Sequence, residues 1–575
     1  MKKVLITLIV ICLSLGSLVS MTHSIEVEEN TEQTAALPTP VPLNKQTPFS
    51  KGYNFYLNGS DVRKDLNPKD LRTNIGKIKF IHDIGGDVVR IPIPLISTMN
   101  NPTHQVDPQI MSSLHALIDE VSKPEYQPMH IIIDNHDGGN NFTKIQESEN
   151  PLTPTEVMIT LWQQMAEEFK DAPDNVVFEL KNEPDWDDTF NQQEWADIQA
   201  RVVNEVREID IVHSIIISEW AKASMNPTRN PFYTRAGLHN KNVILNVHFY
   251  CPVLFSFQGF PTNNYNRVGD IQWPFDAADF PLPESYRYLE YIDSPSLDLD
   301  TSVPAEHYRF TSQPTYMADV INEYTIKANI LDAPLFVGEW GTGGKQGIQA
   351  ARLQYYNFIA EQFGQRGISW TSWNLDDYQW APMDITKHTT DFLYENDVFP
   401  DVLQAMGLHA KSLPHIGTDN FVMYDEDVHW CKNFGLWWGE YSATPYSTRF
   451  DTDGNHSLLD IKYTGSNRDV RFQFMDGIDA TQFVADGYTL EFDAKADGDV
   501  PVWVGFANSG SGRLNKRVDL VGNHQYHHYS VPLNNLGASG GIDTNHYDVL
   551  SMVGGTPEAG NIEYDNVVLQ APHQS

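Results

Sequence analysis

Two short stretches of the sequence place a carboxylate at or near the end of a strand-like apolar run. In FELKNEPDW, Glu183 follows the mostly apolar run 176–180, and in FVGEWG, Glu339 ends the run 334–339. Asn, Pro and Asp are common where strands stop, so a turn alone could explain the first stretch. A pair of carboxylates also suits glycoside hydrolysis, in which one protonates the leaving oxygen and the other attacks the anomeric carbon. Glu183 and Glu339 are therefore the candidate catalytic residues.

Further polar and aromatic side chains lie at or near the ends of other apolar runs. They are Arg90, His136, Asn182, His248, Tyr250 and Trp373. Each is weak evidence alone, because an arginine in a strand can simply pair with a buried acid and a histidine can be a satisfied core residue. Together they would place two carboxylates, two imidazoles, a guanidinium, a phenol and an indole at one end of one domain. Chance explains such a set poorly.

The two carboxylates would need unequal surroundings. An attacking Glu339 should be ionised, so it needs cationic or hydrogen-bonding partners, and Arg90 and Tyr250 are candidates. Glu183 must keep its proton until it acts, which requires partial desolvation and the nearby negative charge of Glu339. Asn182 could bond the 2-hydroxyl of the sugar being cleaved.

The other three side chains have simpler expected roles. Trp373 offers a flat apolar face to the sugar ring. His136 and His248 could bond hydroxyl groups or tune Glu183.

The elements that would position these residues alternate between apolar strands and amphipathic helices. Eight candidate strands cover residues 50–57, 87–94, 130–136, 176–181, 214–219, 242–250, 334–339 and 368–374. Near-continuous apolar runs are typical of parallel strands covered on both faces. Eight strand–helix units with polar strand ends favour a (β/α)₈ TIM barrel over a doubly wound open sheet.

Helix signals lie between these strands. Thr153 and Glu156 flank a proline in a capping-box pattern, and the stretches 195–209 and 350–363 also have helical periodicity. A long aromatic insertion, 251–315, separates the sixth and seventh strands. It could serve function or form a satellite core, and the sequence favours neither.

Length and composition divide the 575-residue chain into several parts. Residues 1–24 have the basic start and apolar run of a signal peptide, and 25–48 form a polar, proline-containing linker. Residues 49–414 form the barrel. Residues 415–575 lose helical periodicity and show short alternating strands, as in an all-β sandwich of the jelly-roll type. The predicted strands here cover residues 458–463, 470–474, 488–494, 500–507, 526–531 and 562–569.

Charge and cysteine content narrow the possible partners. The net charge of −37 makes nucleic acid and anionic membranes unlikely partners. Cys251 and Cys431 fall in different predicted domains, so no disulfide framework is indicated. No HExxH or CxxC pattern occurs, and we expect no catalytic metal or cofactor. We expect a monomer that is secreted and acts on polysaccharide.

The chain resembles glycoside hydrolase family 5, the retaining β-glycanases that include many endoglucanases. The matching stretches, in the family's order over roughly 49–414, are VVRIP, IIIDNHDG, LKNEP, NVHFY, FVGEWG and SWTSWN. The resemblance implies that Glu183 is the acid/base and Glu339 the nucleophile. It also implies that Arg90, His136, Asn182, His248, Tyr250 and Trp373 hold the substrate or support the pair. Many members have two adjacent histidines where this chain has His136 and Asp137.

In the C-terminal part, the stretch YDEDVHW at 424–430, the pair Trp437 and Trp438, and the closing stretch IEYDNVVL resemble galactose-binding-like sandwich modules that accompany glycan-degrading enzymes. Such folds often hold a structural calcium ion, and Asp565 is a candidate ligand. Trp430, Trp437, Trp438 and Trp503 could form a sugar-stacking platform, although any one of these tryptophans is more readily explained as a core residue.

The sequence thus predicts an endo-acting β-1,4-glucanase whose best substrate is cellulose or a related β-glucan. β-Mannan, xyloglucan or mixed-linkage glucan are alternative substrates within the same class. A non-catalytic glycan-binding protein is the alternative from a different class, and the intact carboxylate pair argues against it.

Overall fold

The structure is a computed structural model of the chain. It describes residues 36–57, 68–99, 103–126, 129–137, 142, 145, 150–184, 191–219, 237–258, 269, 271–275, 308, 310–343, 349–375, 400–409, 416, 418–424, 431–437, 447–450, 457–462, 468–474, 478, 480–507, 513–539, 549–554 and 561–572. The predicted signal peptide, 1–24, lies outside this part. Among the described helices, none combines the length and apolar character needed to cross a membrane.

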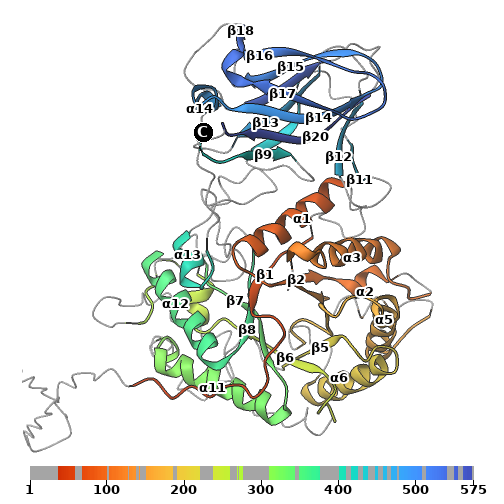
Figure 1. Ribbon diagram of the computed structural model, residues 1–575. Coiled ribbons are helices and arrows are strands. Elements are labelled where there is room, and N and C mark those ends of the chain that lie inside the picture. Colours follow the sequence, from red (N-terminus) through yellow and green to blue (C-terminus); the bar gives the residue numbers. More distant parts are fainter. Residues whose placement is uncertain are drawn as a thin grey trace, which may run out of the picture.

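Eight parallel strands close into a barrel, as the sequence predicts (Figure 1). They pair in chain order, and β1 closes the ring against β8. The strands are β1 Lys51–Asn54, β2 Val88–Ile93, β3 His130–Asn135, β4 Val176–Glu179, β5 Ser214–Ser218, β6 Val243–Phe249, β7 Leu335–Trp340 and β8 Ser369–Ser372. Each lies within a predicted strand or extends it by one residue, since burial on both faces leaves an unmistakable apolar run.

Helices surround the barrel (Figure 1). They are α1 Pro68–Asp83, α2 Leu95–Thr98, α3 Pro108–Val121, α5 Pro154–Phe169, α6 Gln192–Arg207, α8 Val253–Ser256, α11 Pro314–Leu331, α12 Gln349–Arg366 and α13 Pro400–Ala405, with a 3₁₀ turn η1 at Pro124–Tyr126. The capping box at α5 forms as predicted: the Thr153 side chain accepts from the backbone N–H of Glu156, and the Glu156 side chain accepts from that of Thr153. This fixes where α5 begins.

The barrel interior is layered. At the bottom is an apolar plug that includes Val88, Ile132 and Ile244. Two residues further along the same strands the interior positions become polar, with Arg90 on β2 and Asp134 on β3. Because side chains alternate across a strand, β4 and β6 show the same change, from Val177 to Glu179 and from Ile244 to Asn246. The plug fills one end of the barrel interior, and the polar side chains lie toward the other end, where the strands stop.

The C-terminal part contains two six-stranded antiparallel sheets, consistent with the predicted β-sandwich. One sheet has the order β10-β13-β19-β15-β16-β18 and the other β11-β12-β20-β14-β17, with β9 beside β20. The strands are β9 Phe421–Tyr424, β10 Cys431–Trp437, β11 Ser447–Phe450, β12 Ser457–Lys462, β13 Arg468–Phe474, β14 Thr489–Ala496, β15 Val500–Ala507, β16 Arg513–Leu520, β17 His527–Pro532, β18 Gly537–Ser539, β19 Val549–Gly554 and β20 Asn561–Gln570.

The sandwich has more strands than the sequence predicts. Six strands match the predicted stretches, whereas β9, β10, β11, β16, β18 and β19 were not predicted. A short helix, α14 Ala480–Ala485, and a 3₁₀ turn, η4 Leu533–Asn535, also interrupt a region expected to lack helix. Phe483 of α14 is fully buried in the sandwich core, which explains why one helical turn is stable there.

Two connecting stretches pack on the barrel. Part of the predicted linker lies against its helices, where the N–H of Val41 donates to Asn322 of α11 and that of Leu43 to the carbonyl of Arg366. In the described part of the aromatic insertion, Phe255 and Trp273 are buried in the barrel core. These two aromatic side chains therefore serve packing, and most of the insertion lies outside the described residues.

Candidate active site

Glu339, the candidate nucleophile, lies on β7 between a cation and a phenol. Nη1 of Arg90 is 3.0 Å from one carboxylate oxygen, and the Tyr250 hydroxyl donates to the other at 2.9 Å. Burial and the nearby Glu339 charge raise the pKa of Tyr250 well above 10, so the phenol stays protonated and can donate. Both oxygens of Glu339 thus accept hydrogen bonds, which fix the orientation of the carboxylate.

Arg90 is fully buried and is held by more than Glu339. Its guanidinium makes two hydrogen bonds to Glu179, at 2.6 and 2.8 Å, and an ion pair of 2.9 Å with Asp134. Nη2 also donates to the side-chain oxygen of Asn182 at 2.9 Å. Although burial opposes the charge, the surrounding carboxylates raise the pKa of Arg90 well above its usual value. The guanidinium of Arg90 is therefore paired with three carboxylates, those of Asp134, Glu179 and Glu339.

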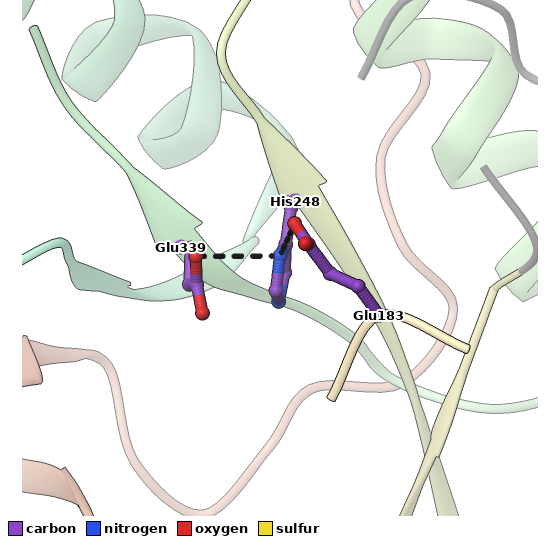
Figure 2. Close-up of side chains that lie close together, drawn as sticks. All are labelled: Glu183, His248 and Glu339. Carbon is purple, nitrogen blue, oxygen red and sulfur yellow. Dashed lines mark hydrogen bonds and ion pairs between the residues drawn. The ribbon is translucent and has the colours of Figure 1, made fainter. Parts of the chain in front are cut away.

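Glu183, the candidate acid/base, lies beyond the end of β4 and faces His248 of β6 (Figure 2). Nδ1 of His248 is 2.8 Å from Glu183 and 3.5 Å from Glu339, so the imidazole lies between the two carboxylates. Burial lowers the pKa of His248 to about 4, and the ring is therefore neutral near neutral pH. A neutral imidazole can share a hydrogen bond with Glu183 without fixing that carboxyl in its ionised form.

The same three side chains are spaced closely enough to bind a metal. One ligand atom from each of Glu183, His248 and Glu339 lies within 4.8 Å of the others, and this is the one such cluster among the described residues. Two carboxylates and an imidazole are ligands that zinc accepts. Arg90 and Tyr250 already occupy both oxygens of Glu339, however, so the geometry also has a complete explanation in hydrogen bonds.

An aromatic wall flanks the carboxylate pair. His136 stacks on Trp373 with ring centroids 5.6 Å apart and planes 14° from parallel, and Tyr56 meets both rings edge-on. The sequence placed His136 and Trp373 at this position but missed Tyr56, which follows β1 and is 43% exposed. A tyrosine just after a strand carries no distinctive signal by itself.

Asp137 does not belong to this wall. Its carboxylate accepts the backbone N–H groups of Ile96 and Ser97, and it is almost fully buried. The side chain that replaces a second histidine here holds the start of α2 instead of facing a substrate.

The structure thus brings all eight predicted site residues to the same end of the barrel. It also adds a polar layer beneath them that the sequence analysis did not identify: Asn54, Asp134, Glu179 and Asn246. The missed signal is spacing. Asn246, His248 and Tyr250 alternate along one strand, as do Asp134 and His136, so the polar residue two positions before each of these histidines points to the same interior. Asp376 and Asp377, which could compete as catalytic carboxylates, lie outside the described residues.

Residues 50–379, more than half of the chain, match the family model described as cellulase, glycosyl hydrolase family 5. The chain belongs to glycosyl hydrolase family 5. The matched region begins at the first strand of the barrel and extends past the eighth, so the family 5 region is the barrel with its strand-end residues.

Curated relatives of this family 5 chain are distant. It is 23% identical to endoglucanase 3 of Fibrobacter succinogenes over 61% of this chain and 53% of that protein. It is 25% identical to endoglucanase B of Ruminococcus albus over 49% of this chain and 58% of that protein. The chain thus spans about half the length of the curated relatives it matches.

A solved structure, endoglucanase Cel5A of Thermotoga maritima, aligns at 18% identity. The alignment covers 62% of this chain and 96% of that chain, with a TM-score of 0.44. The barrel of the family 5 chain is established by its own strand pairing.

Proposed function

We propose that this protein is an endo-acting β-1,4-glucanase that hydrolyses cellulose or a related β-glucan with retention of configuration. The observation that carries the proposal is the separation of the two carboxylates, with one oxygen of each within 4.8 Å. Retaining enzymes hold their carboxyl groups about 5–5.5 Å apart, whereas inverting enzymes need about 6.5–9.5 Å to admit a water molecule. The named endoglucanase relatives support the choice of substrate class.

In the first step, Glu339 attacks the anomeric carbon while Glu183 gives its proton to the departing glycosidic oxygen. Arg90 and Tyr250 hold the Glu339 carboxylate aligned, through contacts of 3.0 and 2.9 Å. In the second step, the deprotonated Glu183 takes a proton from water, and the resulting oxygen attacks the anomeric carbon of the glycosyl ester. Glu339 leaves as the free carboxylate, and Glu183 is protonated again.

The first test is the stereochemistry of the product and the identity of the labelled residue. On a soluble β-glucan, proton NMR should show the β-anomer of the new reducing end before it mutarotates. A 2-deoxy-2-fluoro glycoside with a good leaving group should add one sugar to the peptide that contains Glu339. Initial formation of the α-anomer would overturn the retaining mechanism, and a label on another residue would overturn the assignment of Glu339.

Substitution tests the two roles separately. Glu339→Gln and Glu183→Gln should each lower kcat by about 10⁴-fold or more, because each removes a group that acts in the bond-making step. Glu168→Gln, which changes an exposed carboxylate on α5, is the matched control and should retain wild-type activity. Near-normal turnover by either active-site variant would contradict its role.

A substrate panel separates the remaining alternatives. Cellulose, mixed-linkage glucan, xyloglucan and β-mannan should be offered to the wild-type protein, and product lengths should be measured. Internal cleavage releases long products first. Absence of reducing-sugar release from every substrate would favour the non-catalytic glycan-binding alternative.

We also propose that the chain is exported and that its C-terminal sandwich binds glycan. The apolar run near the N-terminus supports export, and the N-terminal sequence of protein recovered from the medium tests it. Trp503 of β15 supports glycan binding, because its side chain is 39% exposed on the sheet rather than packed in the core. A structural calcium ion at Asp565 remains a proposal, and an unfolding temperature that is lowered by a calcium chelator would support it.

A further inference from the structure

Asp134 lies on β3, two positions before His136 and on the same interior face. It is fully buried, and one of its oxygens, Oδ2, lies 2.9 Å from Nη2 of Arg90 and 2.7 Å from Nδ1 of His136. Its other oxygen, Oδ1, is buried without a hydrogen-bond partner in the part of the chain that the structure describes. A single atom of Asp134 therefore joins the cation that holds Glu339 to the aromatic wall.

Arg90 and His136 depend on Asp134 to different degrees. Arg90 keeps two bonds to Glu179 and further bonds to Asn54 and Asn182 if Asp134 is removed. For the His136 ring, Asp134 is the one hydrogen-bond partner among the described residues. The loss of Asp134 should therefore disturb the imidazole more than the guanidinium.

The contact also selects the tautomer of His136. Burial lowers the pKa of His136 to about 4, so the ring is neutral near neutral pH and carries a single N–H. Burial raises the pKa of Asp134 to about 7, so above that pH its ionised Oδ2 can only accept a hydrogen bond, and the proton of the His136 ring is therefore placed on Nδ1. Nε2 is left with a lone pair. Stacking on Trp373 fixes the plane of the ring. The bond to Asp134 selects which of the two flipped orientations of the ring in that plane is adopted.

We propose that Asp134 is a positioning residue that holds His136 in its Nδ1-protonated form and presents Nε2 as a hydrogen-bond acceptor to a substrate hydroxyl. The inference rests on the proposed function, since the hydroxyl belongs to the sugar chain. Asp134, which belongs to the polar layer beneath the site, thus contributes to recognition of the substrate as well as to holding Arg90.

The test compares Asp134→Ala, Asp134→Asn, His136→Ala and the double variant Asp134→Ala/His136→Ala on a soluble cello-oligosaccharide. Asp134→Ala should lower kcat/KM about ten- to hundredfold, because the imidazole loses its partner and its fixed tautomer. Asp134→Asn can keep an oxygen at the Oδ2 position, with its NH₂ where Oδ1 lacks a partner. It should stay within about fivefold of wild type. The double variant should match His136→Ala within about twofold, since Asp134 acts through His136.

Three kinetic results would overturn the proposal. They are wild-type kcat/KM in Asp134→Ala, an Asp134→Asn variant as impaired as Asp134→Ala, and fully additive losses in the double variant. Thermal unfolding of each variant shows whether a loss of activity comes from a loss of folded protein.

A second measurement does not depend on activity. Long-range ¹H–¹⁵N spectra of the histidine rings, with His136 assigned from the His136→Ala spectrum, should show an Nδ1-protonated ring in wild type. Asp134→Ala should shift it toward the Nε2-protonated form, and an unchanged tautomer would overturn the proposal. If wild-type protein hydrolyses no glycan, the proposed function fails, while these spectra still decide whether Asp134 controls the ring.

Discussion

A histidine next to two carboxylates occurs in both halves of the molecule, with opposite consequences. In the barrel, His248 lies 2.8 Å from Glu183 and 3.5 Å from Glu339, and burial lowers its pKa to about 4. In the sandwich, His528 lies 2.8 Å from Asp493 and 2.9 Å from Glu491. Hydrogen bonding to Asp493 raises the pKa of His528. The His528 side chain is 62% exposed, so the loss of hydration that opposes its charge is small.

The comparison shows that neighbouring charges alone do not set the state of a histidine. Burial decides whether the attraction of carboxylates outweighs the loss of hydration. The barrel therefore keeps a neutral hydrogen-bonding group between two catalytic candidates, whereas the sandwich has a titratable cross-strand link on its surface. Two arginines also differ in burial, with Arg90 enclosed and Arg517 of β16 exposed beside Asp519, although three carboxylates keep the buried Arg90 charged.

The largest expected effect comes from removing the buried cation. Arg90→Met should lower the free energy of unfolding by about 3–5 kcal/mol, because buried carboxylates that share Arg90 lose their counter-charge. Arg517→Met is the matched control, and it should change stability by no more than about 0.5 kcal/mol, because exposed pairs contribute little. Urea unfolding of both variants measures the difference, and equal changes would contradict the contrast between the two regions.

A smaller effect should appear in the dependence of stability on pH. For His248, the folded pKa of about 4 lies below the ordinary value of 6.5, so the unfolded chain binds more protons between these values. Its contribution to stability is therefore lost as the pH falls from about 6.5 to 4, by roughly 3 kcal/mol. The destabilisation caused by His248→Gln should shrink by that amount over the same range.

His528→Gln should behave in the opposite direction. Because the folded pKa of His528 is raised, its contribution is present below 6.5 and is lost as the pH rises through the raised value. Exposure keeps this change smaller than that at His248. Chemical unfolding at several pH values measures both variants, and slopes of the same sign would show that burial does not separate the two histidines.

The sequence could predict the barrel and the eight strand-end residues because both follow from strong local patterns. Strands covered on both faces form continuous apolar runs, and their ends interrupt these runs with polar groups. The layer beneath the site was missed, since Asp134 and Glu179 lie inside apolar runs and gain meaning only once β2, β3 and β4 are adjacent. Tyr56 was missed for a related reason, because its contacts with His136 and Trp373 cross from β1 to β3 and β8.

In the sandwich, the alternating pattern was too weak to reveal β16 and β18, which lie at one edge of their sheet. Burial there is one-sided, so each strand has only every second residue to mark it. Trp503 illustrates the limit: a tryptophan in a strand is more often core, and only the register of β15 places it outside.

The smallest expected effect on turnover, and the last contrast, concerns two tryptophans. Trp373 belongs to the site, where it contacts His136 and packs beside Tyr250, whereas Trp503 is exposed on the sandwich, opposite Arg517. Trp503→Ala should leave kcat/KM on a soluble oligosaccharide within about twofold of wild type. It should weaken retention on insoluble β-glucan about five- to thirtyfold, as expected for a lost aromatic anchor.

The matched control is Val521→Ala, which removes an exposed apolar side chain just after β16 and should alter neither quantity. Trp373→Ala should instead reduce turnover of the soluble substrate, because its indole lines the site itself. Sedimentation with insoluble β-glucan and initial rates on the oligosaccharide separate the two roles. Unchanged retention of Trp503→Ala on insoluble β-glucan would contradict a glycan site at Trp503. It would not affect the roles proposed for the barrel residues.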